Sequence, residues 1–242
     1  VFGEGFLVLR GKHRMFLQSY VGGLYTGRNP GESDVDTRHT IGADFLLATS
    51  TFLGNENLGL GGFFLNTTNP RSAGRSNAYG LRLEYPNDPW SGSVLYREIQ
   101  ENYDAAVGFT PRIGIRRLNP EVAYTSRPRG HSLIRSVQYG ASSNLLFSTI
   151  DNKLLNRELD FTLFNLATHR QDIFQVKVLP TYERLENNFA ISRGITLPVG
   201  SEYDWTRYRF QVATAPRRTI AMNQTVELGG FYDGTRTRVA TD

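Results

Sequence analysis

Strand-like segments follow one another along the whole of this 242-residue chain, and the links between them alternate between short and long. Outer-membrane barrels have this alternation because the turns on the periplasmic side only reverse the chain, whereas the loops on the outer side are longer. No class of soluble β protein requires it. The alternation therefore predicts an all-β fold, an antiparallel transmembrane β-barrel.

About twelve strand-like runs are visible, and most reach the roughly 9 to 11 residues that a strand needs to cross a membrane at a tilt. The runs are 2–10, 14–25, 37–52, 56–67, 77–85, 90–99, 114–126, 134–148, 157–167, 172–183, 204–215 and 218–232. The short links are 11–13, 54–55, 86–89, 127–133, 168–171 and 216–217, and the long links are 26–36, 68–76, 100–113, 149–156 and 184–203.

The two ends of the sequence lead us to expect a fragment. Residues 1–5 lack the basic and apolar parts of a secretion signal. A last run, 235–240, starts a further strand and stops early. We therefore expect residues 1–242 to form one barrel domain that lacks terminal strands, within a barrel of at least fourteen. A closed barrel of twelve strands with a tail is the alternative.

Apolar and polar side chains alternate within the runs, as they do when one face meets lipid and the other meets the lumen. Tyr208 and Phe210 alternate with Arg207 and Arg209, for example. A soluble sandwich also alternates, but its strands are usually about 5 or 6 residues long. The charged residues that we expect to face the lumen are Arg82, Glu84, Arg117, Glu121, Lys177, Glu183, Arg207 and Arg209.

Composition excludes several classes of site. The chain has no Cys, so it can form neither a disulfide nor a thiolate metal site. The net charge of +4 is too small to indicate a nucleic-acid partner. No motif indicates a cofactor or a metal site, and the sequence predicts neither.

A group of basic and acidic residues surrounds the long link 100–113. Guanidinium groups suit bidentate pairing with a carboxylate or a phosphate. The group could contact an anion, such as a lipopolysaccharide phosphate, at the rim, or it could form an internal salt-bridge network that pins the loop, which we favour. Its members are Arg112, Arg116, Arg117, Glu98, Glu101 and Asp104.

One cluster has the residue types of a hydrolase at a barrel rim, where carboxylates and a histidine could activate water. It consists of Glu32, Asp34, Asp36 and His39. Acidic residues in a loop rich in Gly, Asn and Pro are more often simply solvated. We therefore predict that the protein is not an enzyme and keep a rim hydrolase as a distant alternative.

Four segments together resemble a large bacterial family. They are VGFTPRIGIRR (107–117), PTYERLENNF (180–189), ITLPVGSEYDWTRY (195–208), and APRR (215–218) with GGFYDGTR (229–236). That family joins an N-terminal carbohydrate-binding module, similar to family 9 of those modules, to a C-terminal domain of unknown function expected to be an outer-membrane barrel. The resemblance implies location and architecture, and it implies no catalytic residues.

The sequence thus leads to an expected role as an anchor or scaffold for an attached or partner domain, with a charged and plugged lumen. A conduit or gated transporter for a polar solute such as a saccharide is the alternative. We expect a location in the bacterial outer membrane of a Gram-negative organism. The expected partners are outer-membrane lipid, lipopolysaccharide and a periplasmic or surface protein, with no nucleic acid.

Overall fold

The structure is a computed structural model that describes residues 3–29, 31, 37–68, 74–219 and 221–241. Within these residues the chain forms antiparallel β-strands and no helix. Accordingly, the described residues contain no helix of the length and apolarity that a membrane crossing requires. The prediction of an all-β antiparallel fold is confirmed.

The strands follow the chain in order, and most have ten residues or more. The bounds are β1 Gly5–Met15, β2 Ser19–Asn29, β3 Arg38–Phe52, β4 Glu56–Thr68, β5 Asn77–Pro86, β6 Trp90–Ile99, β7 Ile115–Ser126, β8 Ile134–Ser148, β9 Leu154–Thr168, β10 Ile173–Arg184, β11 Phe189–Ser192, β12 Ile195–Leu197, β13 Glu202–Ala213, β14 Asn223–Phe231 and β15 Gly234–Thr241.

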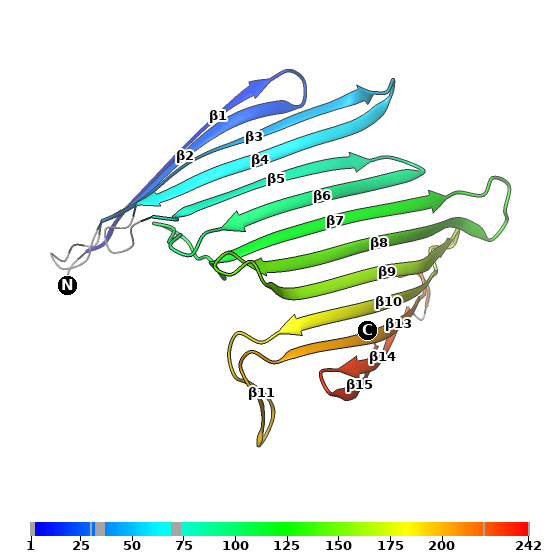
Figure 1. Cartoon of the computed structure of the whole chain (residues 1–242). Helices are drawn as coiled ribbons and strands as arrows, with labels where there is room; N and C mark the ends of the chain where they lie inside the picture. Colours follow the sequence, from blue (N-terminus) through cyan, green and yellow to red (C-terminus); the bar gives the residue numbers. More distant parts are fainter. Residues whose placement is uncertain (1–2, 30, 32–36, 69–73, 220, 242) are drawn as a thin grey trace. The chain divides into compact units, whose positions relative to one another are not determined.

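Thirteen strands pair in chain order from β1 to β10 and on through β13, β14 and β15, and β11 pairs with β12 as a separate hairpin (Figure 1). The sheet is open, since among the described residues β1 and β15 each have a neighbour on one side only. The chain divides into two compact units. Unit 1 comprises Val1–Pro86, Ser93–Leu118 and Phe147–Lys153, and unit 2 comprises Asn87–Gly92, Asn119–Leu146 and Leu154–Asp242.

The turn predicted at 11–13 is wrong. These residues lie inside β1, and the chain reverses at 16–18, where Phe16 has a φ of 54°. Glycine and charged residues such as those at 11–13 are typical of turns, but here they lie inside a paired strand. Arg10 forms an ion pair with Asp44, and the Lys12 ammonium lies 3.6 Å from the centre of the Tyr20 ring.

The predicted alternation of short and long links holds as far as the link after β6 and then fails. The link 127–133, expected to be short, is longer than the link 149–153 that follows it. Likewise, β14 begins at Asn223 rather than at residue 218, so the link before it is longer than the two-residue link after it. The predicted loop 184–203 also contains the hairpin β11–β12.

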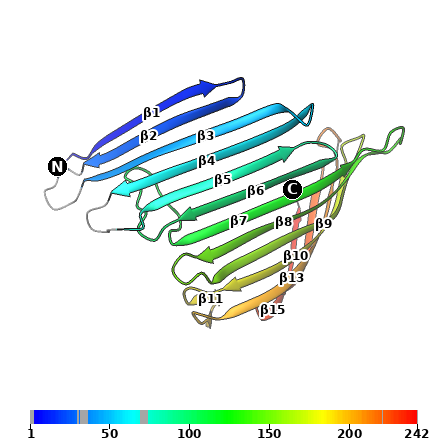
Figure 2. The ribbon, with the colours of Figure 1, turned by 45° about the horizontal axis from the view of Figure 1, so that its top comes forward.

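Pairing register assigns each side chain of the sheet to one of two faces, because residues opposite each other on paired strands share a face. In unit 1 the strands β1 to β5 lie side by side in chain order (Figure 2), and their register defines an apolar face that runs across them. Its exposed side chains include Leu7, Leu9, Val21, Ile41, Leu47, Leu60, Phe64, Leu81 and Leu83. The opposite face, the polar face, carries Arg10, Asp44, Arg82 and Glu84.

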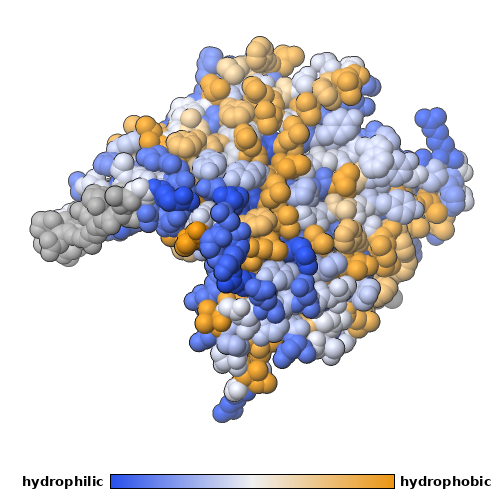
Figure 3. Space-filling model, viewed as in Figure 1, coloured by the Kyte–Doolittle hydropathy of each residue, from blue (hydrophilic) through white to orange (hydrophobic). Residues whose placement is uncertain are grey.

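The same separation holds in unit 2. Lys177, Arg209 and Glu227 lie opposite one another on β10, β13 and β14 and share the polar face. The apolar face carries exposed Phe174, Tyr208, Phe210, Val212, Leu228 and Val239. Orange apolar residues accordingly reach the surface in Figure 3, interspersed with blue hydrophilic ones. Much of the apolar side-chain area of this fold is therefore not buried within either unit.

Candidate functional site

A carboxylate shared by two arginines lies on the polar face of unit 2. Glu227 accepts a hydrogen bond from Arg207 Nη1 at 2.8 Å on one oxygen and bonds from Arg209 at 2.8 and 2.9 Å on the other. Its side chain is only 4% exposed. Charge-assisted bonds of this kind are the strong ones, and a buried carboxylate needs them to offset its lost hydration.

Neighbouring groups on the same face are also paired. Lys177 Nζ lies 2.9 Å from Asp160, and the amide of Asn144 donates to Glu158 at 3.1 Å. Asn119 in turn donates to Asn144 at 3.0 Å. These contacts connect the polar side chains of β7, β8, β9 and β10 into one layer.

The polar face of unit 1 has two ion pairs of its own. Arg10 Nη2 donates to Asp44 at 2.8 Å across β2, at a point where Gly22 leaves room for the guanidinium. Arg82 pairs with Glu84 two positions along β5. Sequence reasoning did not identify Arg10, Asp44, Asp160 or Glu227. Their alternation with apolar neighbours was visible, but their partners lie on other strands.

Of the eight residues predicted to face a lumen, those whose register can be followed lie on the polar face of their unit, and their exposure to a lumen stays a prediction. Arg82 and Glu84 share the polar face of unit 1. In unit 2, Lys177, Glu183, Arg207 and Arg209 share one face by register. Glu121 has the same parity as Asn119, and Arg117 has that parity on β7. The Nε atom of Arg117 is buried without a hydrogen-bond partner among the described residues.

The loop 100–114 lies over the polar face of unit 1. The backbone N–H of Ala106 donates to Thr40 Oγ1 at 3.0 Å, and that of Asp104 donates to Thr67 Oγ1 at 3.3 Å. Thr40 and Thr67 lie opposite each other on β3 and β4, on the face that carries Asp44, and both are almost fully buried. The loop therefore reaches back from β6 and covers the end of this face.

The acidic residues of this loop pair with arginines outside it. Glu101 lies 2.7 Å from Arg75 and accepts a hydrogen bond from Thr149 Oγ1 at 3.2 Å. Asp104 pairs with Arg38 at the start of β3. These contacts join the loop to three separate parts of unit 1.

The three arginines of the predicted group do not converge. Arg116 and Arg117 are consecutive in β7 and point to opposite faces. Arg116 pairs with Glu98 at 3.0 Å on the face that carries Tyr96, whose hydroxyl donates to the same carboxylate oxygen. Arg112, in the loop before β7, also takes part in an interaction. These contacts hold the loop in place, and the three arginines do not come together to form one anion-binding site.

The ion pair of Glu101 affects its titration. Burial raises the pKa of Glu101, but the hydrogen bond from a backbone N–H, the Arg75 guanidinium and the Thr149 hydroxyl outweigh burial, and the pKa lies below its ordinary value. A carboxylate with a lowered pKa in the folded state stabilises that state when it is ionised.

Five aromatic rings gather beside Glu183 in unit 2. The centre of the Tyr232 ring lies 4.9 Å from that of Trp205 and 5.1 Å from that of Tyr203. Phe231 and Phe189 complete the group, the latter contributed by β11. The Tyr232 hydroxyl donates to Glu183 at 2.9 Å, and burial together with this bond raises the pKa of Tyr232 to about 12. The group connects the β11–β12 hairpin with β13 and β14.

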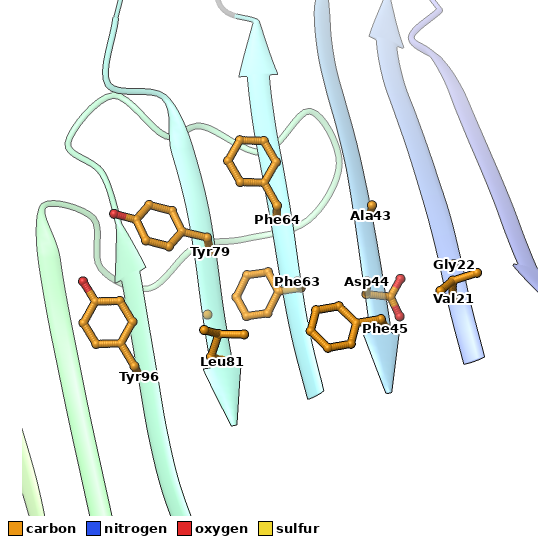
Figure 4. Close-up of a pocket in the computed structure, with 11 residues that line it drawn as sticks. Val21, Gly22, Ala43, Asp44, Phe45, Phe63, Phe64, Tyr79, Leu81 and Tyr96 are labelled. Carbon is orange, nitrogen blue, oxygen red and sulfur yellow. The ribbon is translucent and has the colours of Figure 1, made fainter. Parts of the chain in front are cut away.

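A hollow of about 400 Å³ opens on the apolar face of unit 1. Figure 4 shows Phe45, Phe64 and Tyr79, which project from the neighbouring strands β3, β4 and β5 around it. Ala43 leaves the space between the larger side chains. The hollow is lined mainly by apolar and aromatic side chains, and the carboxylate in its lining, that of Asp44, is paired with Arg10.

The hypothesised rim hydrolase rests mainly on Glu32, Asp34 and Asp36, which lie outside the described residues. His39 lies in β3, where its Nδ1 atom is 2.8 Å from the Tyr25 hydroxyl and its ring stacks on that of Tyr25. In the described ranges no three His, Cys, Asp or Glu side chains are arranged to hold a metal ion.

Comparisons of the chain with family models, with curated proteins and with solved structures gave no match.

Replacing Glu227 by Gln should destabilise the fold, because Arg207 and Arg209 would lose the carboxylate that neutralises them. Breaking a buried ion pair costs on the order of 3–5 kcal/mol, and the partial exposure of the two arginines places the expected loss near the lower end. Urea unfolding followed by tryptophan fluorescence measures it. Glu84→Gln, at a carboxylate 41% exposed, is the control and should cost less than about 1 kcal/mol. Equal losses for the two variants would contradict the stabilising role of Glu227.

Acid should weaken the attachment of the loop through Glu101. Because the folded pKa is lowered, the contribution of Glu101 is fully present above the unfolded value of about 4.3 and is lost as the pH falls through the folded pKa. The wild-type protein should therefore unfold at a higher temperature than Glu101→Gln at pH 7, and the difference should shrink below about pH 4.3. A difference that stayed constant down to pH 2 would contradict this assignment.

Proposed function

We propose that the chain forms part of the wall of an outer-membrane β-barrel that acts as an anchor or scaffold for an attached or partner domain. One observation carries the proposal. In both units the pairing register places most exposed apolar side chains of β2–β5, β10, β13 and β14 on one face and most charged side chains of these strands on the other. Lipid outside and paired charges inside would satisfy both faces.

The position of the charges on the apolar face supports the same proposal. Glu98 and Arg116 lie where β6 ends and β7 begins. Arg157 and Asp204 form an ion pair close to the starts of β9 and β13. All four residues are therefore close to the links 100–114, 149–153 and 185–201, at the height where a membrane strand would reach the head groups. Charges are costly near the centre of a bilayer and nearly neutral at its surface.

The number of strands bears on the size of the proposed barrel. In a meander of thirteen antiparallel strands the first and the last point the same way. Outer-membrane barrels of bacteria close with antiparallel pairs and an even number of strands. A barrel of fourteen or more, with an odd number of added strands, would meet this requirement. The resemblance to the domain joined to carbohydrate-binding modules also favours an outer-membrane barrel.

The pairing of charges favours an anchor over an open conduit. Asp44, Asp160 and Glu227 of the polar face each form an ion pair with a neighbouring Arg or Lys, and the loop 100–114 lies over that face in unit 1. A selective pore would instead present an unpaired ring of one charge. The lumen that we propose is therefore internally neutralised and obstructed.

Site-directed spin labels test the orientation of the faces. The chain has no Cys, so a single introduced Cys is labelled uniquely. In vesicles, Leu81→Cys and Leu83→Cys should be more accessible to oxygen, which partitions into lipid, and Arg82→Cys and Glu84→Cys to a water-soluble nickel complex. A protein that stays soluble without detergent, with positions 81 and 83 shielded from both reagents, would overturn the membrane barrel in favour of a sandwich.

Single-channel recording separates the anchor from the conduit. The full-length protein in planar bilayers should give no stable conductance steps, because paired charges and the loop obstruct the proposed lumen. Deleting 104–110 serves as the matched change, since it removes the part of the loop that bonds to Thr40 and Thr67 and leaves the strands intact. Stable ohmic steps from the unaltered protein would replace the anchor by a conduit for a polar solute.

A further inference from the structure

The register between β6 and β7 brings two arginines together. These strands lie side by side within the sheet, and each has a paired strand on either side (Figure 1). Near one end of the pair the backbone N–H of Thr125 donates to the carbonyl of Pro89 at 2.7 Å. Near the other end Arg116 pairs with Glu98 at 3.0 Å. Both contacts belong to one antiparallel register, without a shift between them.

Arg97 and Arg117 lie directly opposite each other in this register. Arg97 precedes Glu98, and Arg117 follows Arg116. Consecutive residues of a strand point to opposite faces. Since Glu98 and Arg116 lie on the apolar face, the two arginines lie on the polar face. Like charges directly opposite each other destabilise a strand pair unless something neutralises them.

The neighbours of these arginines on β5, β6 and β7 carry no charge. Gln100 donates its backbone N–H to the carbonyl of Asn77 at 2.9 Å. In that register Gly80 of β5 lies opposite Arg97, and the ring of Phe63 lies next to Gly80. The residues two positions away on the same face of β6 and β7 are Leu95, Ile99, Ile115 and Asn119.

Neither guanidinium forms a hydrogen bond or an ion pair within the described part of the chain, although the arginines around them do. The Nε atoms of Arg97 and Arg117 are both buried from solvent and lack an acceptor there. Buried donors in proteins normally have a partner. An anion between the two side chains would supply acceptors for both Nε–H groups and remove the repulsion between the charges.

The chemistry of the pair favours a phosphate group over a carboxylate. A guanidinium presents its N–H groups as a planar fork that bonds two oxygens at once. A phosphate monoester has three acceptor oxygens and a charge of about −1.5 to −2 at pH 7. It can therefore satisfy two forks and balance two positive charges, whereas one carboxylate has two oxygens and a single charge.

We propose that Arg97 and Arg117 together bind a phosphate group on the polar face of unit 1, each through its Nε–H and one Nη–H. The pair is thus an exception to the neutralised charges of this face. The inference does not rest on the proposed function, because the polar face could meet a dissolved phosphate in a barrel or in a soluble sheet. Phosphate binding is measured separately from lipid contact, so either can fail alone.

Calorimetric titration of the full chain with inorganic phosphate, in a maltoside detergent and at constant ionic strength, tests the site. Arg97→Gln and Arg117→Gln should each weaken binding about 10- to 150-fold, since a hydrogen bond to a charged group contributes about 1.5–3 kcal/mol and 1.4 kcal/mol corresponds to tenfold. Arg135→Gln, the same change of charge at an exposed arginine of β8, should leave binding unaltered. Tighter binding of methyl phosphate than of phosphate would identify a monoester as the ligand, and the reverse would identify the free anion.

Thermal unfolding distinguishes a binding role from a structural one. Without phosphate, Arg97→Gln should unfold at the same temperature as the wild type or a higher one, because the repulsion of Arg117 is removed. Phosphate should then stabilise the wild type and have no effect on the variant. Arg97→Glu places a carboxylate opposite Arg117, so it should abolish phosphate binding in a protein that remains folded.

Three results would overturn the inference. The first is an effect of phosphate no larger than that of chloride at the same ionic strength. The second is an equal loss of binding in Arg135→Gln. The third is a lower unfolding temperature of Arg97→Gln in phosphate-free buffer, which would show that Arg97 has its partner within the protein. Spin labels at Leu83 report lipid contact independently of each result.

Discussion

Antiparallel backbone pairing is the constraint on which the rest of this structure depends. Once the register between two strands is fixed, each side chain is committed to one face, and a slip by one residue would exchange the faces. The contacts of Glu227 illustrate this. The carboxylate meets Arg207 and Arg209 only because Arg209 is opposite Glu227 and Arg207 lies two positions away on the same side.

The two faces differ in how they would be stabilised. Side chains of the polar face find partners within the sheet, as Arg10 does in Asp44 and Lys177 in Asp160. Those of the apolar face, such as Leu81 and Tyr208, remain half exposed and have no second layer within their own unit. Burial of apolar surface is worth roughly 25 cal/mol per Å². That energy is still available to an external apolar phase, which is why lipid is the environment that we propose.

Local pattern was sufficient to predict much of the fold. The bounds of β6 and β8 agree with the runs 90–99 and 134–148, and β3, β4 and β5 differ from the runs by a residue or so, because their alternation is regular and their turns contain Gly, Pro, Asn or Asp. The first turn could not be found in this way. Phe16 and its neighbours carry no turn signal, whereas Gly11 does and lies in a strand.

Pairs within the candidate site were less predictable than the faces. Parity placed Arg207 and Arg209 on one side, but which carboxylate they meet depends on long-range register. Likewise, Glu101 was expected to bond with nearby Arg112, Arg116 or Arg117 and instead meets Arg75, in the preceding long link. Proline inside a strand usually marks a bulge or a strand end, yet β10 continues through Pro180 in register with β13. The irregularity of β10 falls between Val176 and Lys177, where it pairs with β9.

The loop 100–114 has a consequence for the order of folding. Its bond from Ala106 to Thr40 joins residues 66 positions apart, and its other contacts reach Thr67, Arg75 and Thr149. These partners exist as a set only after β3 to β5 have aligned and the chain has passed through β8. The loop can therefore form all these contacts only late in folding. Its ordering would indicate that the hairpins of unit 1 have already paired in the native order.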